Sequence, residues 1–266
     1  MHRLANSCWI VLLCVAALAV PAGRLAAADP GADAPASTRS RAAKLPRPLT
    51  RYQGREIAQT MHYTGAPWLV RESRQREEDC QLLLDALHLQ PGQTVCDMGC
   101  GNGFYTLQLA QRVGPTGRVF AVDVQPEMLH MLAERARDAG LKNIKPVLGT
   151  LADPKLPIGQ LDLILLVDVY HEFSHPEEML AAMRRALKPH GRLALAEFRL
   201  EDPEVPIKLL HKMSKKQILK EYAPNGLKLV EQFDKLPWQH LMFFEPAKPE
   251  IGAAASPDSQ PPARPR

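Results

Sequence analysis

Cysteine and aromatic residues are scarce in this sequence, and the excess of positive over negative charge is small. Only five cysteines occur in 266 residues, and two of them, Cys8 and Cys14, lie in an apolar stretch near the N-terminus. The other three are Cys80, Cys96 and Cys100. Their odd number argues against a disulfide framework and favours a role for them as small residues packed in the core. The formal net charge is +4, and no basic run or basic and aromatic stripe favours a nucleic-acid partner.

The N-terminal 28 residues have the pattern of a secretory signal peptide. Arg3 precedes an unbroken apolar run over residues 8–20, and three alanines at 26–28 form a small-residue cleavage site. We therefore expect an exported protein, periplasmic or secreted. The uncharged stretch 4–23 is just long enough to remain in a bilayer as an anchor if it is not cleaved.

The remaining chain divides by composition into a linker, a folded domain and a tail. Residues 29–51 are rich in Ala, Pro, Arg and Ser without apolar periodicity, which predicts a disordered linker. Residues 250–266 are similar and predict a disordered tail. The folded domain is then expected over 52–249, where the apolar content is sufficient for a core.

A glycine-rich turn near residue 100 is the most informative motif. A short apolar strand reaches Asp97 and is followed by Gly99, Gly101 and Gly103 before a helix. Glycines let the backbone turn sharply, so that a ligand can lie against the first amides of the helix. In a dinucleotide fingerprint the third glycine comes one residue later, where this chain has Phe104. The Asp97 carboxylate would repel a pyrophosphate but attract an ammonium or sulfonium group.

This Asp-x-Gly-x-Gly-x-Gly motif resembles the first motif of class I methyltransferases that use S-adenosylmethionine (SAM). Residues 169–180 resemble the stretch after the fourth strand in small-molecule methyltransferases, including those of quinone biosynthesis. Residues 187–191 resemble their Leu-Lys-Pro-Gly-Gly turn, and the likeness extends over about 82–198. The resemblance implies one α/β domain with a doubly wound, seven-stranded, mostly parallel sheet of the Rossmann-like type.

Apolar runs and turn residues place the elements of this fold. Strands are expected at 95–98, 118–124, 143–148, 161–169, 192–198, 226–230 and 238–244, and helices at 71–87, 105–113, 126–138, from 176 to the turn at 188–191, and 214–222.

Asp123 ends the second predicted strand, and an acid at that position can accept both hydroxyls of a ribose. Its alternative role is to cap the helix that begins at Pro126. The resemblance implies that Asp97 faces the methionine ammonium of SAM, that Asp168 lies near the sulfonium end, and that Thr150 falls nearest the adenine. The full set of expected cofactor contacts is Asp97, Gly99, Gly101, Asn102, Gly103, Asp123, Val124, Thr150, Leu151 and Asp168.

His171 and Glu172 are the candidate catalytic residues. They follow the fourth predicted strand, where the transferred methyl group should point, and a base is needed only if the acceptor must lose a proton. Loop hydrogen bonds and helix capping are their alternative roles. His62, His211 and His240 are further histidines that could enter the pocket.

Residues 171–175 also match His-Glu-x-x-His, the zinc-protease pattern. That mechanism needs the pentapeptide on a helix, so that both imidazoles share one face. Pro176 directly follows the second histidine and disfavours a helical conformation for His175. We therefore assign no metal ligands, and a zinc hydrolase acting through His171, Glu172 and His175 is the weaker alternative.

The segment 52–70 at the start of the domain is rich in aromatic residues, and its apolar residues follow neither a helical nor a strand period. The resemblance suggests a lid over the cofactor, and a surface arm that packs its tryptophan on the core is the alternative. The expected function is methyl transfer from SAM to a small-molecule acceptor, with a non-catalytic binding module of the same fold as another alternative. A membrane contact is expected only if the signal segment is retained, and the sequence assigns no oligomeric state.

Overall fold

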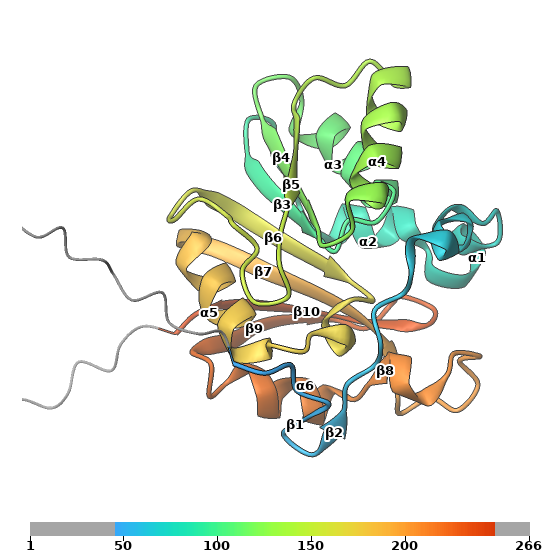
Figure 1. Ribbon diagram of the computed structural model, residues 1–266, viewed down its shortest axis with the longest axis vertical. Coiled ribbons are helices and arrows are strands. Elements are labelled where there is room, and N and C mark those ends of the chain that lie inside the picture. Colours follow the sequence, from blue (N-terminus) through green and yellow to red (C-terminus); the bar gives the residue numbers. More distant parts are fainter. Residues whose placement is uncertain (1–45, 248–266) are drawn as a thin grey trace, which may run out of the picture. The chain divides into compact units, whose positions relative to one another are not determined.

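The computed structural model describes residues 46–247 (Figure 1). The expected signal peptide, the linker up to residue 45 and the expected tail lie outside the described residues. Among residues 46–247, no helix has the length and apolar character needed to cross a membrane.

One large sheet organises the domain, with strand order β5-β4-β3-β6-β7-β10-β9. Its strands are β3 (Thr94–Met98), β4 (Arg118–Asp123), β5 (Ile144–Leu148), β6 (Leu161–Val167), β7 (Leu187–Arg199), β9 (Leu227–Phe233) and β10 (Gln239–Pro246). The first five pair in parallel with one another, whereas β10 is antiparallel to both β7 and β9. The predicted seven-stranded, mostly parallel sheet is confirmed.

Short strands add to this plan. The two-residue β8 (Lys212–Met213) runs parallel to the end of β7. Near the N-terminus of the described chain, β1 (Arg51–Tyr52) and β2 (Arg55–Glu56) form a separate hairpin. Neither feature was predicted, because two-residue strands carry no periodic pattern.

Helices cover both faces of the sheet. The α-helices are α1 (Arg74–Glu78), α2 (Cys80–Ala86), α3 (Phe104–Val113), α4 (Pro126–Asp138), α5 (Pro176–Ala186) and α6 (Lys215–Tyr222), and the 3₁₀ helices are η1 (Tyr63–Val70), η2 (Tyr170–Glu172) and η3 (Leu209–His211). Alternate residues of β6 serve the two cores: Leu163 and Leu165 pack with α2 and α3, while Ile164 and Leu166 pack with α5 and α6. A parallel strand buried on both faces explains its continuous apolar run.

The single helix expected over 71–87 is wrong. The chain breaks at Asp79, which has a left-handed φ of 49° and separates α1 from α2. Its carboxylate accepts a hydrogen bond from the backbone N–H of Leu82 at 3.2 Å and so caps α2. Arg74 and Glu78 of α1 are both buried.

The turn expected at 188–191 is also placed differently. Helix α5 ends at Ala186, and β7 already begins at Leu187, which pairs with Leu161 of β6. The register between these strands becomes regular only from Leu163 and Arg192. The predicted strand 192–198 therefore lies within a longer one.

Candidate functional site

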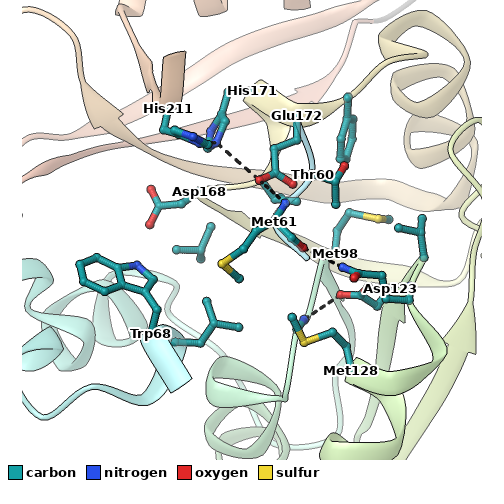
Figure 2. Close-up of a pocket in the computed structure, with 18 of the residues that line it drawn as sticks. Thr60, Met61, Trp68, Met98, Asp123, Met128, Asp168, His171, Glu172 and His211 are labelled. Carbon is teal, nitrogen blue, oxygen red and sulfur yellow. Dashed lines mark hydrogen bonds and ion pairs between the residues drawn. The ribbon is translucent and has the colours of Figure 1, made fainter. Parts of the chain in front are cut away.

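A cavity of about 540 Å³ lies at the carboxyl ends of the parallel strands (Figure 2). The chain passes from β3 outward to β4 and β5 and then returns to β6 on the other side of β3. This reversal is the usual ligand position in a doubly wound sheet. The predicted site residues that line the cavity are Gly99, Gly101, Asp123, Val124, Thr150, Leu151, Asp168, His171 and Glu172.

The glycine loop leaves no room for side chains. Gly99 and Gly101 have φ values of 70° and 52°, in the left-handed region that favours glycine. A Cβ on Gly99 would overlap the side chain of Val169, and a Cβ on Gly101 would lie 2.5 Å from Cδ1 of Leu69. Glycine at these two positions therefore keeps the loop backbone accessible from the cavity.

Asp123 braces the same loop from the end of β4. Its Oδ2 accepts the backbone N–H of Gly101 at 2.9 Å, and its Oδ1 accepts that of Gln125 at 2.9 Å. Burial raises the pKa of this carboxyl. Asp123 also lines the cavity (Figure 2). It therefore contacts the glycine loop and lies at the position expected for a ribose.

Asp97, Asn102 and Gly103 lie behind the loop and do not line the cavity. Asp97 is buried, its Oδ2 accepts a hydrogen bond from the Thr106 hydroxyl at 2.5 Å, and burial raises its pKa to about 6. The Asn102 side chain donates to the carbonyl of Ala66 at 3.1 Å. These residues determine the shape of the loop and the electrostatic potential around it. Their direct contact with a cofactor stays a prediction.

Asp168 presents an unsatisfied acceptor to the cavity. Its Oδ2 accepts a hydrogen bond from Gln239 at 2.7 Å, whereas its buried Oδ1 has no hydrogen-bond partner among the described residues. Burial, together with the nearby carboxylates Glu78 and Glu197, raises the pKa of Asp168. Because an unpaired buried oxygen is costly, the position suits a ligand that donates hydrogen bonds, such as an ammonium group.

Arg74 and Glu78 line this part of the cavity as well, although they were predicted only as the charged start of a helix. Nε of Arg74 donates to Oε2 of Glu78 at 2.8 Å, and the guanidinium lies 4.4 Å from the ring centroid of Phe104. A fixed cation and two carboxylates therefore meet beside the glycine loop. This charge pattern complements the ammonium and carboxylate of a methionine.

The opposite end of the cavity carries His171, held by a buried glutamate of β7. Nδ1 of His171 lies 2.7 Å from Oε2 of Glu197, and the backbone N–H of His171 donates to Oε1 at 3.2 Å. Burial alone would lower the pKa of His171, but the Glu197 carboxylate outweighs it and the pKa is raised. The ring is therefore fixed in orientation.

Glu172 and His211 lie beside His171 (Figure 2). Nδ1 of His211 is 3.0 Å from Nε2 of His171, and Oε1 of Glu172 is 4.0 Å from the same atom. Oε1 of Glu172 also accepts the backbone N–H of Met61 at 3.2 Å. Burial raises the pKa of Glu172 to about 7, and burial together with His171 lowers the pKa of His211.

The other histidines considered from the sequence do not line this cavity. His62 hydrogen-bonds to Thr64, and His240 lies 2.8 Å from a carboxylate oxygen of Glu201. Nε2 of His175 lies 3.0 Å from the carbonyl oxygen of Pro46. His175 is thus turned away from His171 and Glu172, and the zinc site of the His-Glu-x-x-His alternative is not formed.

The segment before α1 supplies one wall. Thr60, Met61, Trp68 and Leu69 line the cavity. Gln125 fixes this segment: its side chain donates to the carbonyl of Met61 at 2.9 Å and accepts the backbone N–H of Tyr63 at 2.8 Å. Trp68 is 49% exposed rather than packed in the core.

Most of the described chain is similar to a known protein family. The family model described as "Methyltransferase domain" matches residues 89–242, more than half of the chain. The chain belongs to this methyltransferase family. The methyl donor is SAM, and the cavity fits it: the glycine loop is bare, Asp123 lies at the tip of β4, and Asp168 offers an unpaired oxygen.

The individual relatives of this methyltransferase are distant. It is 34% identical to the nocamycin O-methyltransferase of Saccharothrix syringae over 42% of its own length and 40% of the relative's. It is 34% identical to the ubiquinone/menaquinone biosynthesis C-methyltransferase UbiE of Legionella pneumophila (strain Lens), over 43% and 46%. The chain thus spans less than half the length of these curated relatives.

A solved SAM-dependent methyltransferase from Aquifex aeolicus matches over most of the domain. The match has a TM-score of 0.66 and 26% identity, and it covers 70% of this methyltransferase and 98% of that chain. The expected class I fold is confirmed by this match.

Sequence reasoning missed Glu197 and the α1 pair, Arg74 and Glu78. Glu197 carries a usable signal, because it is a single carboxylate within the apolar strand Leu193 to Phe198. A carboxylate in a strand buried on both faces needs a partner and marks a site. The α1 pair carries no comparable signal, since charged residues near a helix start are ordinary.

Proposed function

We propose that this methyltransferase transfers the methyl group of SAM to a small-molecule acceptor that binds between the glycine loop and His171. One observation carries the proposal: a single cavity extends from Gly99 and Asp123 to His171 and Glu172. Donor and acceptor can then lie end to end in a common enclosure. Positioning of this kind is the main contribution of an enzyme to an in-line displacement.

SAM supplies an activated methyl group on its sulfonium. The protein's own residues bind and orient: Asp123 faces the expected ribose, and Asp168 with Arg74 faces the expected methionine. At the far end, His171 or Glu172 takes up the proton of the acceptor when the acceptor must lose one. Glu197 is a positioning residue, because it holds the His171 ring and does not itself line the cavity.

The acceptor wall points to a mostly apolar molecule with one ionisable group. Phe173, Phe198 and Ile207 line the cavity along with His171 and His211. A phenol, an enol or an acidic carbon fits this combination, because its apolar body is desolvated while its proton meets an imidazole. The relatives named for nocamycin and for ubiquinone and menaquinone support a small-molecule acceptor.

Methyl transfer from labelled SAM to a panel of phenols and enols tests the proposal. His171→Asn is expected to lower kcat by about 10²- to 10⁴-fold, the usual contribution of a positioned base, while SAM affinity stays within about twofold. His190→Asn, at an exposed position of β7 outside the cavity, is the matched control. SAM binding without transfer to any acceptor of these classes would favour the non-catalytic binding module instead.

We also propose that the protein is exported through residues 1–28. The support is the sequence pattern alone: a basic start, an apolar run and a small-residue cleavage site. Terminal sequencing of protein recovered from its own host is expected to begin at Asp29. A cytoplasmic protein that retains Met1 or its next residue would contradict export.

A further inference from the structure

Three ligand-type atoms converge at the acceptor end of the cavity. Nε2 of His171, Nδ1 of His211 and a carboxylate oxygen of Glu172 all lie within 4.8 Å of one another. They come from separate parts of the chain, because His171 and Glu172 belong to η2 and His211 to η3. Figure 2 shows the three side chains on the same side of the cavity.

The two imidazoles face each other through nitrogen atoms. Because Nδ1 of His171 lies 2.7 Å from the Glu197 carboxylate, that nitrogen carries its proton toward Glu197, and Nε2 presents a lone pair when the ring is neutral. Nδ1 of His211 lies 3.0 Å away, so a proton or a cation must separate the two lone pairs. A divalent cation can take the place of that proton.

We propose that His171, Glu172 and His211 bind one divalent cation of the first-row metals, such as Zn²⁺ or Co²⁺. Metal–ligand bonds of about 2.0–2.2 Å allow ligand atoms to lie up to about 4.4 Å apart. The separations of 3.0 Å between His171 Nε2 and His211 Nδ1 and of 4.0 Å between His171 Nε2 and Glu172 Oε1 meet this condition for two of the three ligand pairs. Two imidazoles and one carboxylate favour such cations over Mg²⁺ and Ca²⁺, which prefer oxygen ligands.

Glu197 supplies the outer contact that such a site requires. A metal-binding histidine usually donates its second ring N–H to a carboxylate or carbonyl, which fixes the tautomer and the ring orientation. Glu197 does this for His171 and is fully buried. The site therefore has an ordered second layer on the side away from the cavity.

Three protein ligands leave coordination positions open toward the cavity. If the proposed function holds, an oxygen of the acceptor can occupy one of them, and its proton passes to solvent more readily because the cation stabilises the resulting anion. His171 is then a ligand, and its direct role as base applies only to the metal-free protein. The cation site differs from the His-Glu-x-x-His alternative in using His211 in place of His175.

The test uses tag-free protein that has been stripped with a chelator and dialysed. Titration with Co²⁺, followed by its visible absorption bands, and with Zn²⁺, followed by elemental analysis after gel filtration, is expected to give one equivalent per chain. His211→Ala and Glu172→Gln each remove one ligand and should weaken affinity at least tenfold. Glu197→Gln should weaken it by about 10- to 100-fold, the usual effect of an outer-layer partner.

His130→Ala is the matched control, because His130 is an exposed histidine of α4 outside the cavity. Circular dichroism on each variant separates a lost ligand from a lost fold. The proposal is overturned if wild-type protein binds less than about half an equivalent, or if His211→Ala and Glu172→Gln bind as tightly as wild type. Since metal content is measured without an acceptor, failure here leaves SAM binding and methyl transfer as separate results.

Discussion

At the scale of single residues, Asp97 determines how the cofactor loop is charged. The carboxyl group is buried behind the loop, hydrogen-bonded to Thr106 and near Asp123 and Arg74. Burial raises its pKa to about 6, so the group changes charge within a readily studied pH range. Its anion would attract the ammonium of SAM, whereas its neutral form would not.

SAM affinity is therefore expected to depend on pH through Asp97. The ionised fraction of Asp97 falls as pH drops through about 6, so the Kd for SAM should rise between pH 7 and pH 5. Calorimetric titration over this range measures the change. Asp97→Asn should bind more weakly at pH 7 and lose most of the pH dependence; a variant with the full wild-type profile would contradict this role.

The residues that sequence could predict were those whose chemistry is local. Gly99, Gly101 and Asp123 were predicted at the site and line the cavity, because the turn and the strand tip impose fixed spacings on the chain. The partners of His171 were not, because Glu197 lies 26 residues away and His211 lies 40 residues away. Such contacts depend on how the fold brings β6, β7 and η3 together, and the spacing of residues along the sequence does not predict this.

At the scale of elements, the loop between β3 and α3 depends on glycine for two separate reasons. Gly99 has φ of 70°, and a Cβ would in addition overlap Val169. Gly99→Ala should therefore cost about 1–2 kcal/mol for the left-handed backbone and about 1–3 kcal/mol more for overpacking. Urea unfolding measures the total.

Gly140→Ala separates the two costs. Gly140 has φ of 67°, and a Cβ there would meet no atom within 4 Å. It should lose only the backbone cost, about 1–2 kcal/mol. Equal losses at the two positions would contradict the packing role of Gly99 against Val169.

The cavity wall that includes Thr60, Met61, Trp68 and Leu69 depends on Gln125, which makes two hydrogen bonds to the backbone of this segment. Gln125→Ala should release this segment and raise amide exchange at Met61 and Tyr63. Two hydrogen bonds at about 1 kcal/mol each total about 2 kcal/mol, so SAM binding should weaken by up to about thirtyfold. Gln108→Ala on α3 is the matched control, because the Gln108 side chain donates to the carbonyl of Phe104 in its own helix. Unchanged exchange in Gln125→Ala would show that the wall is held by other contacts.

The elements themselves were predicted where a long apolar period governs them. Helix α4 was placed at its observed bounds, and β4 within one residue, because each has a clear pattern and a clear stop. The helix over 71–87 was not, because Asp79 adopts a left-handed conformation and caps a new helix inside a continuous helical pattern. Local capping chemistry overrode periodicity there.

At the scale of the whole molecule, the sheet topology produces the site. The return of the chain from β5 to β6 brings the loops after β3, β4, β5 and β6 to one cavity. The antiparallel pair β9 and β10 closes the sheet and contributes Gln239, which holds Asp168. The fold class followed from the order of motifs. The acceptor wall instead combines His171 of η2, Phe198 of β7 and His211 of η3 with Phe173 and Ile207, and no order of motifs predicts that combination.

Calorimetric titration with SAM and with S-adenosylhomocysteine tests the central claim most directly, namely that the cofactor binds across the glycine loop and Asp123. Wild-type protein is expected to bind each ligand at one site with micromolar affinity. Asp123→Ala should weaken both at least tenfold, while the exposed Asp153→Ala, outside the cavity, should match wild type. Wild-type protein that binds neither ligand, or an Asp123→Ala variant with wild-type affinity, would contradict the account.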